Sequence, residues 1–193
     1  PQTKLLTFRN LAEAACLQYR FEGKETLGKG PLVVALDKSG SMQGDKDVWA
    51  TALALAVLGV AQHERRPFAL ICFDSDVKHE AIVMPGTMLP EAALFVAPDF
   101  GTDIDKAVRR GLQIITERPG GLRAADIVLI TDGISEPMLA PELRERAVKL
   151  GVTVLGVAID VEPSRLTPWC DEVVAARDMT GIDDDLANVL FGR

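Results

Sequence analysis

The sequence predicts an α/β fold in which a mostly parallel central sheet is covered by helices on both faces. Two observations support this prediction. Short apolar runs of strand length alternate along the chain with longer segments of helical periodicity. Some of these runs end directly on an aspartate or on a polar turn, which is typical of buried parallel strands that carry polar residues to their carboxyl ends.

The composition is that of an ordinary globular domain without a basic surface. Hydrophobic residues make up 48% and charged residues 25% of the 193 residues, enough for a sizeable single core. A formal net charge of −7 with no basic stripe argues against a nucleic-acid partner. The apolar stretch 48–61 is shorter than the about 20 residues that a membrane span needs, so we expect a buried helix whose outer face is covered.

The predicted strands are apolar runs bounded by glycine, proline or acidic residues. In chain order they cover residues 32–36, 68–73, 77–84, 127–130, 152–159 and 170–175. The run 77–84 follows closely on the preceding one and alternates weakly, so it is predicted to turn back as an antiparallel edge strand.

The predicted helices lie between these strands, at residues 45–65, 103–116, 137–150 and 183–191, with a single turn within 89–95. Asp45 is the candidate N-cap of the first, and Thr102 or Asp103 of the second. The third has Pro137 or Pro141 near its first position and ends at Gly151. Strands that alternate with helices imply right-handed crossovers. The result is a Rossmann-like, doubly wound, mostly parallel sheet with one antiparallel edge strand and helices on both faces.

The first 29 residues form a separate segment in this interpretation. Residues 4–16 have the spacing of an amphipathic helix, residues 17–21 alternate like a short strand, and residues 22–30 are polar and rich in glycine. We expect residues 1–29 to pack on the core or to link it to an upstream domain, and residues 30–193 to form the main domain.

Oxygen-bearing side chains gather where three predicted loops leave the same edge of the sheet. Asp37, Ser39 and Ser41 follow the first strand, Thr102 precedes a helix, and Asp132 follows a later strand. Hydroxyl and carboxylate oxygens suit a hard cation such as Mg²⁺ or Mn²⁺. The first three residues alone are a weak signal, because a polar turn with a capping serine has the same pattern.

The order Asp-x-Ser-x-Ser, then Thr, then Asp resembles the metal-ion-dependent adhesion site (MIDAS) of von Willebrand factor A (VWA) domains, over residues 30–160. The resemblance implies that Ser39 and Ser41 coordinate the metal, that Thr102 binds directly or through water, and that Asp37 and Asp132 mostly hold metal-bound waters. It also implies a non-enzymatic protein-interaction module, with residues 30–193 as the VWA domain, in which a partner supplies an Asp or Glu to the cation.

The chain departs from the family pattern at two positions. Phe100 stands where many relatives have a second glycine, and Lys38 fills the free position between Asp37 and Ser39. We expect Lys38 to point away from the metal. Met42 and Phe100 are expected to form a dry apolar rim around it.

Residues 17–23 and Gly30-Pro31 are similar to the bacterial ViaA and CoxE-like VWA proteins, which work with MoxR-type AAA+ ATPases. This resemblance implies a chaperone-like or cofactor-insertion assembly with such an ATPase or its client. Three cysteines without close pairing, with Cys72 inside an apolar run, favour a reducing compartment. We therefore expect a cytoplasmic protein.

Two other function classes remain open at this stage. A Mg²⁺-dependent phosphatase or phosphotransferase could use Asp37 as its nucleophile, although the haloacid-dehalogenase type needs an aspartate where Ser39 stands. The other class is an extracellular adhesion module. The lack of paired cysteines argues against this class.

Several further polar or aromatic residues receive structural interpretations. The isolated His63 and His79 are not expected to be ligands, and Asp183-Asp184-Asp185 is attributed to a helix start. Asp74-Ser75-Asp76 is predicted to be a hairpin turn. Trp169 is a candidate surface contact as an alternative to a core position.

Overall fold

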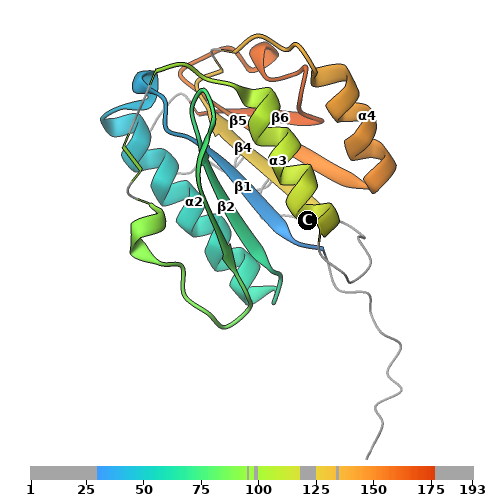
Figure 1. Cartoon of the computed structure of the whole chain (residues 1–193). Helices are drawn as coiled ribbons and strands as arrows, with labels where there is room; N and C mark the ends of the chain where they lie inside the picture. The colour runs from blue at the N-terminus through green and yellow to red at the C-terminus, as the bar shows by residue number, and fades with distance from the viewer. Residues whose placement is uncertain (1–29, 95, 98–99, 118–124, 134, 177–193) are drawn as a thin grey trace, which may run out of the picture.

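A six-stranded sheet forms the centre of the molecule in the computed structural model, which describes residues 30–94, 96–97, 100–117, 125–133 and 135–176 (Figure 1). The strand order is β3-β2-β1-β4-β5-β6. The strands are β1 (Leu32–Asp37), β2 (Phe68–Phe73), β3 (Val77–Val83), β4 (Ala125–Thr131), β5 (Val152–Ile159) and β6 (Glu172–Ala176). Only the β2–β3 pair is antiparallel, so the predicted fold class is confirmed.

Helices cover both faces of this sheet. Helix α2 (Asp45–His63) lies on one face, and α3 (Ile104–Glu117) and α4 (Ala140–Leu150) lie on the other (Figure 1). Three short 3-10 turns, η1 (Gly40–Met42), η2 (Glu91–Ala93) and η3 (Pro163–Arg165), lie in the connections.

Two hydrophobic cores result, one on each face of the sheet. Strands β1 and β2 are buried along their whole length, because side chains alternate between two covered faces. Val33 and Ala35 pack on the α3 and α4 side, whereas Val34 and Leu36 pack on the α2 side. The apolar runs therefore lack the polar alternation of a half-exposed strand.

All six predicted strands are found, although β4 begins two residues earlier and β6 two residues later than predicted. The predicted N-cap of α2 and the predicted start of α4 are wrong. The residue before α2 is Gly44, with φ of 85°, and Asp45 is the first helical residue instead of the N-cap. Helix α4 begins at Ala140 rather than at Pro137, and Pro141 lies in its first turn, as one of the two predicted alternatives. Asp103 caps α3 by accepting a hydrogen bond from Lys106 N at 3.0 Å, as one of the two predicted alternatives.

Some predictions lie outside the described residues: the helix at 4–16, the strand at 17–21, and the helix at 183–191 with its three aspartates. On the outward face of α2, Val48 and Leu55 are 69% and 42% exposed, so at these two positions the described residues do not provide the expected cover. In the described ranges, no helix is long and apolar enough to cross a membrane.

Trp169 is a core residue, and the surface-contact alternative is wrong. Its side chain is buried, and Nε1 donates a 2.6 Å hydrogen bond to Asp105 Oδ1. The other oxygen, Asp105 Oδ2, accepts a 2.7 Å bond from Leu139 N. The buried carboxylate therefore joins α3 to the start of α4 and to the segment before β6.

Replacing Trp169 by Phe should lower the free energy of unfolding by about 1–3 kcal/mol beyond the loss of ring area, because a buried carboxylate oxygen loses its donor. Urea denaturation measures this effect. Trp49→Phe is the matched control, since Trp49 is partly buried and no hydrogen bond from its indole is found in the described structure. Equal losses in the two variants would contradict the role of the hydrogen bond.

Candidate metal centre

The candidate site lies at the point where the strand order reverses. Strands β1 and β4 are neighbours, and the chain leaves β1 toward β2 but leaves β4 toward β5. In open α/β sheets such a point opens a crevice at the carboxyl ends of the strands. Asp37 is the last residue of β1, and Asp132 directly follows β4.

Asp37 joins the ends of these two strands. Its side chain is fully buried. Oδ1 accepts a hydrogen bond from Ser39 N at 2.8 Å, and Oδ2 accepts one from Thr131 Oγ1 at 2.5 Å. Thr131 Oγ1 in turn accepts a 3.0 Å bond from Gly133 N. One carboxylate thus holds two of the three loops that carry candidate ligands.

Burial raises the pKa of Asp37 to about 6. The hydrogen bonds from Thr131 and Ser39 lower this pKa, and the negative charge of Asp132 raises it further. The ionised carboxylate therefore lacks the positive environment that it needs at neutral pH. A cation in front of it would supply that environment.

Ser39 and Ser41 bring two hydroxyl oxygens together. Their Oγ atoms lie 3.0 Å apart, with Ser39 buried and Ser41 exposed. Adjacent ligand oxygens of an octahedral Mg²⁺ site, with metal–oxygen distances of about 2.1 Å, are also about 3.0 Å apart. The two hydroxyls are hydrogen-bonded to each other, and this distance is also compatible with two neighbouring ligands of one metal ion.

Asp132 provides an oxygen that is not hydrogen-bonded. Oδ1 is buried and has no hydrogen-bond partner in the described structure. Oδ2 lies 3.6 Å from Lys46 Nζ, which lies 3.7 Å from Asp160 Oδ2. Because an unpaired buried carboxylate oxygen is costly, these residues fit a bound hard cation or its water.

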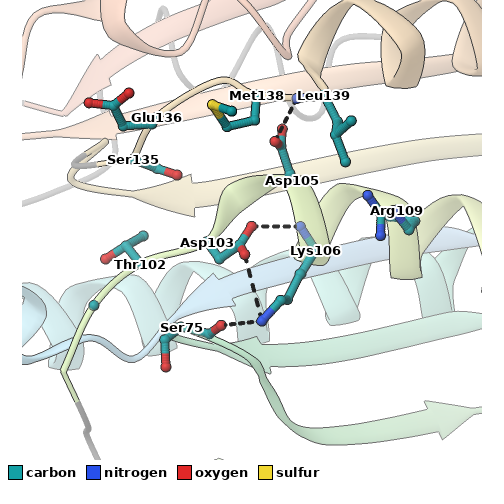
Figure 2. A pocket seen from close by; sticks show the side chains of 11 residues that line it. Ser75, Thr102, Asp103, Asp105, Lys106, Arg109, Ser135, Glu136, Met138 and Leu139 are labelled. Carbon is teal, nitrogen blue, oxygen red and sulfur yellow. Dashed lines mark hydrogen bonds and ion pairs between the residues drawn. The ribbon is translucent and has the colours of Figure 1, made fainter.

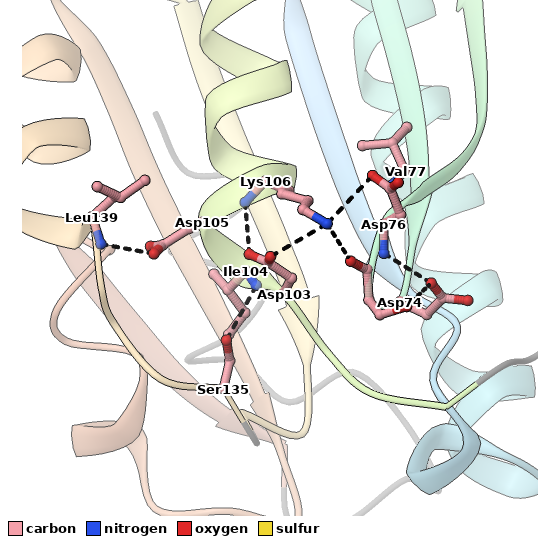
Figure 3. Close-up of polar contacts among 10 residues, drawn as sticks. Asp74, Asp76, Val77, Asp103, Ile104, Asp105, Lys106, Ser135 and Leu139 are labelled. Atoms are coloured by element: carbon pink, nitrogen blue, oxygen red, sulfur yellow. Dashed lines mark hydrogen bonds and ion pairs between the residues drawn. The ribbon is translucent and has the colours of Figure 1, made fainter.

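Thr102 lies on a loop that is fixed from two sides (Figure 3). Asp103 N donates to Asp74 O at 2.7 Å, and Ile104 N donates to Ser135 Oγ at 3.3 Å. Gly101 has φ of 88°, and a Cβ there would lie 3.2 Å from Ser75 Cβ, so a glycine is needed. Among the described residues, no hydrogen bond joins Thr102 to the other four predicted ligands.

No alternative metal-binding cluster of acidic, histidine or cysteine side chains is found in the described part of the chain. It contains no group of three or more His, Cys, Asp or Glu side chains that could hold a metal. His63 and His79 are exposed. Asp74 to Asp76 form the predicted hairpin turn, in which Asp74 Oδ1 accepts a bond from Asp76 N at 2.9 Å. A metal at this edge would depend on serine and threonine ligands.

Lys38 points away from the candidate site, as expected. Its buried Nζ donates to Asp47 Oδ1 at 2.6 Å and to Thr51 Oγ1 at 3.1 Å, so it pins the loop to α2. The expected apolar rim is wrong for Met42, which is buried in the core on the α2 side. Phe100 is 90% exposed.

Sequence reasoning missed Thr131, Lys46 and Asp160. Lys46 carried a signal, because a cation in the first turn of a helix is unfavourable unless an acidic group compensates it. Asp160 has φ of 59°, a conformation that sequence alone does not reveal at an aspartate. Thr131 is the last residue of β4 and lies one residue beyond the predicted strand, where no role was assigned to it.

Comparisons with known proteins agree with this architecture. Residues 32–135 match the family model of the von Willebrand factor type A domain. The uncharacterized protein MJ0811 from Methanocaldococcus jannaschii is 30% identical over 177 residues, which cover 89% of this chain and 40% of that protein. The chain thus spans less than half the length of this relative.

Two solved structures share the fold at low sequence identity. A von Willebrand factor type A protein from Catenulispora acidiphila has a TM-score of 0.63 and 20% identity, covering 84% of this chain and 42% of that one. The pilus adhesin SpaC from Lactobacillus rhamnosus GG has a TM-score of 0.64 and 14% identity, covering 84% and 30%. With a family-model match over more than half of its length, the chain belongs to the von Willebrand factor type A domain family.

Proposed function

We propose that this domain binds a partner protein through a Mg²⁺ or Mn²⁺ ion held by Ser39, Ser41 and Thr102, with Asp37 and Asp132 behind it. Domains of this family commonly mediate protein interaction or adhesion. The observation that carries the proposal is the hydroxyl pair at 3.0 Å, backed by two buried carboxylates. When bound, the ion supplies an electrophilic centre that accepts one more carboxylate.

The residue types explain why the partner group should be acidic. Ser39, Ser41 and Thr102 are neutral ligands, so they leave most of a divalent charge uncompensated. Asp37 and Asp132 lie behind them, and Lys46 already compensates part of the charge of Asp132. A carboxylate from a partner would complete the coordination through a strong charge-assisted contact.

Phosphoryl transfer fits this arrangement poorly. A nucleophilic Asp37 would need a free oxygen that faces the substrate. Its side chain is fully buried, and each oxygen accepts a hydrogen bond. Ser39 stands where the second aspartate of a haloacid-dehalogenase-type enzyme would be. We therefore assign the site to binding rather than to catalysis.

We further propose a MoxR-type AAA+ ATPase or its client as the partner, in the cytoplasm. The support for this partner is the similarity of residues 17–23 and 30–31 to ViaA and CoxE-like proteins. Burial raises the pKa of Cys72 to about 11 and of Cys170 to about 12, and both thiols are free. Buried free thiols fit a reducing compartment better than an adhesin outside the cell.

Loss of a ligand should remove both metal and partner. We expect Ser39→Ala and Thr102→Ala to weaken Mg²⁺ binding at least about tenfold in titration calorimetry, with an unchanged circular dichroism spectrum. Ser164→Ala, at an exposed serine, is the control. A pull-down from the native host, with Mg²⁺ or with EDTA, should lose the same partner in EDTA and with Thr102→Ala. Retention of every partner under both conditions would contradict the proposed function.

The metal-free protein should lose stability as the pH rises from 4 to 6. The pKa of Asp37 is about 6 in the folded state, above its ordinary value of 3.8, so the folded state binds the proton more tightly in this range. The free energy of unfolding then falls with rising pH, by at most about 3 kcal/mol. In EDTA, Asp37→Asn should flatten this slope and be more stable than the wild type at pH 7. Urea denaturation at several pH values tests this, and a wild type that gains stability relative to the variant would contradict it.

Removing the positive charge of Lys46 should strengthen metal binding. Its ammonium lies between Asp132 and Asp160 and competes with a cation for the same carboxylate. We expect Lys46→Met to bind Mg²⁺ about fivefold more tightly, which corresponds to about 1 kcal/mol. Lys149→Met removes the same charge from an exposed pair with Glu145 and should have no effect. Weaker binding by Lys46→Met would mean that Lys46 positions Asp132 rather than competing for it.

A further inference from the structure

A hollow of about 610 Å³ opens beside Thr102 (Figure 2). Its walls are the turn between β2 and β3, the first turns of α3, and residues 135–139 before α4. A partner that reaches the candidate metal centre would lie next to this hollow. The charges that line it therefore indicate what else the partner must carry.

The two acidic side chains at the start of α3 that line the hollow already have partners within the fold. Asp103 accepts a hydrogen bond from Lys106 N, and its Oδ2 lies 3.7 Å from Lys106 Nζ (Figure 3). Asp105 accepts bonds at both oxygens, from Trp169 and Leu139. Lys106 Nζ donates to Ser75 O at 2.7 Å. These groups have little capacity left for a ligand.

Arg109 differs from these residues in lacking a partner within the described structure. Its side chain lines the hollow and is half-buried, yet no ion pair or hydrogen bond of its guanidinium is found in the described structure. The next residue, Arg110, shows the contrast: it binds both oxygens of Glu80 at 2.7 and 2.9 Å. A half-buried guanidinium with five free donors is a ready site for a carboxylate from outside.

The wall opposite α3 is apolar at its centre. Met138 is 78% exposed and Leu139 is half-buried, and both line the hollow. An exposed methionine at a concave surface is well suited to contact a partner's apolar side chain. Glu136 lies on the far side of the hollow from Arg109 (Figure 2), so an acidic group is favoured only at the Arg109 end.

We propose that the hollow receives a linear segment of the partner that carries two acidic side chains. One would complete the metal near Thr102, the second would bind Arg109, and an apolar side chain would contact Met138. This inference rests on the proposed function above, because the first acidic group is the one assigned to the metal.

The rise of α3 gives a length scale for the spacing of the two acidic groups, because Thr102 lies two residues before the helix. Arg109 lies five residues beyond Ile104, the first residue of α3, which is about 7.5 Å along the axis. An extended chain covers this distance in two or three residues and presents alternate side chains on one side. The second acidic residue should therefore lie within about four positions of the first.

Peptide selection on the whole chain tests the proposal. The probes are two displayed libraries of random linear peptides, one with a fixed Asp and one with Asn in its place. Each is selected in Mg²⁺ and in EDTA on the wild type, on Arg109→Gln and on Arg146→Gln. Arg146 is an exposed arginine of α4 and is the matched control for the lost charge. Thermal melting of each variant establishes that it is folded.

The wild type and Arg146→Gln should enrich a second Asp or Glu near the fixed Asp, and Arg109→Gln should not. Mg²⁺-dependent selection without a second acidic residue, or the same enrichment on Arg109→Gln, would overturn this inference and leave the proposed function intact. No Mg²⁺-dependent requirement for the fixed Asp would overturn the proposed function and this inference with it.

A selected peptide then allows a double-mutant cycle. Arg109→Gln, and replacement of the peptide's second acidic residue by its amide, should each weaken binding about 5- to 20-fold. The two changes together should weaken it no more than either alone. If the two fold-losses in affinity multiply in the double variant, the two groups do not interact, and this result would also overturn the inference.

Discussion

The buried carboxylate of Asp37 is the group on which the arrangement of the candidate site depends. It accepts a hydrogen bond from the backbone of Ser39 and another from the hydroxyl of Thr131, and so holds the loop after β1 against the end of β4. Burial makes its charge unfavourable and raises its pKa. This one residue thus holds the two loops together and makes a positive charge beside it favourable.

The rigidity of the sheet makes such a site precise. Strands β1 and β2 are buried on both faces, so their ends are fixed by two cores rather than by loop contacts. The loop with Thr102 is attached to this frame through Asp74 at the end of β2 and through Ser135 after β4. Side chains on short loops can then keep a defined geometry without a ligand, which lowers the ordering cost of binding.

Strands β2 and β5 could be predicted from the sequence to the residue, because Pro67 and Gly151 directly precede continuous apolar runs. The bounds of β4 could not, since it extends beyond the apolar run 127–130 at both ends. The N-cap of α2 could not be predicted in this way. Whether Gly44 or Asp45 is the N-cap depends on the positive φ of Gly44, which the sequence does not show. The spacing from Asp37 to Ser41 identified the candidate loop. The contact of Lys46 with Asp132 was missed, because it joins residues that are close only in the folded chain.

Hydrogen-bond and charge partners are distributed unequally between the two edges of the sheet. At the amino edge, Arg66 donates to Gly30 O at 2.7 Å and to Asp126 Oδ2 at 2.6 Å, and so closes the beginnings of β1 and β4. At the carboxyl edge, Asp132 Oδ1 and the guanidinium of Arg109 lack such partners in the described structure. One is negative and the other positive, so no single simple ion satisfies both.

This difference links stability to function. Each unsatisfied group lowers the stability of the free domain, and a cation at Asp132 together with an acidic group at Arg109 would recover that loss. Because binding to the folded state alone adds to its stability, the proposed metal and partner would each recover part of this loss, and full stabilisation would require both. The same contacts that leave the free domain less stable than its cores allow would then make its binding dependent on two different charges.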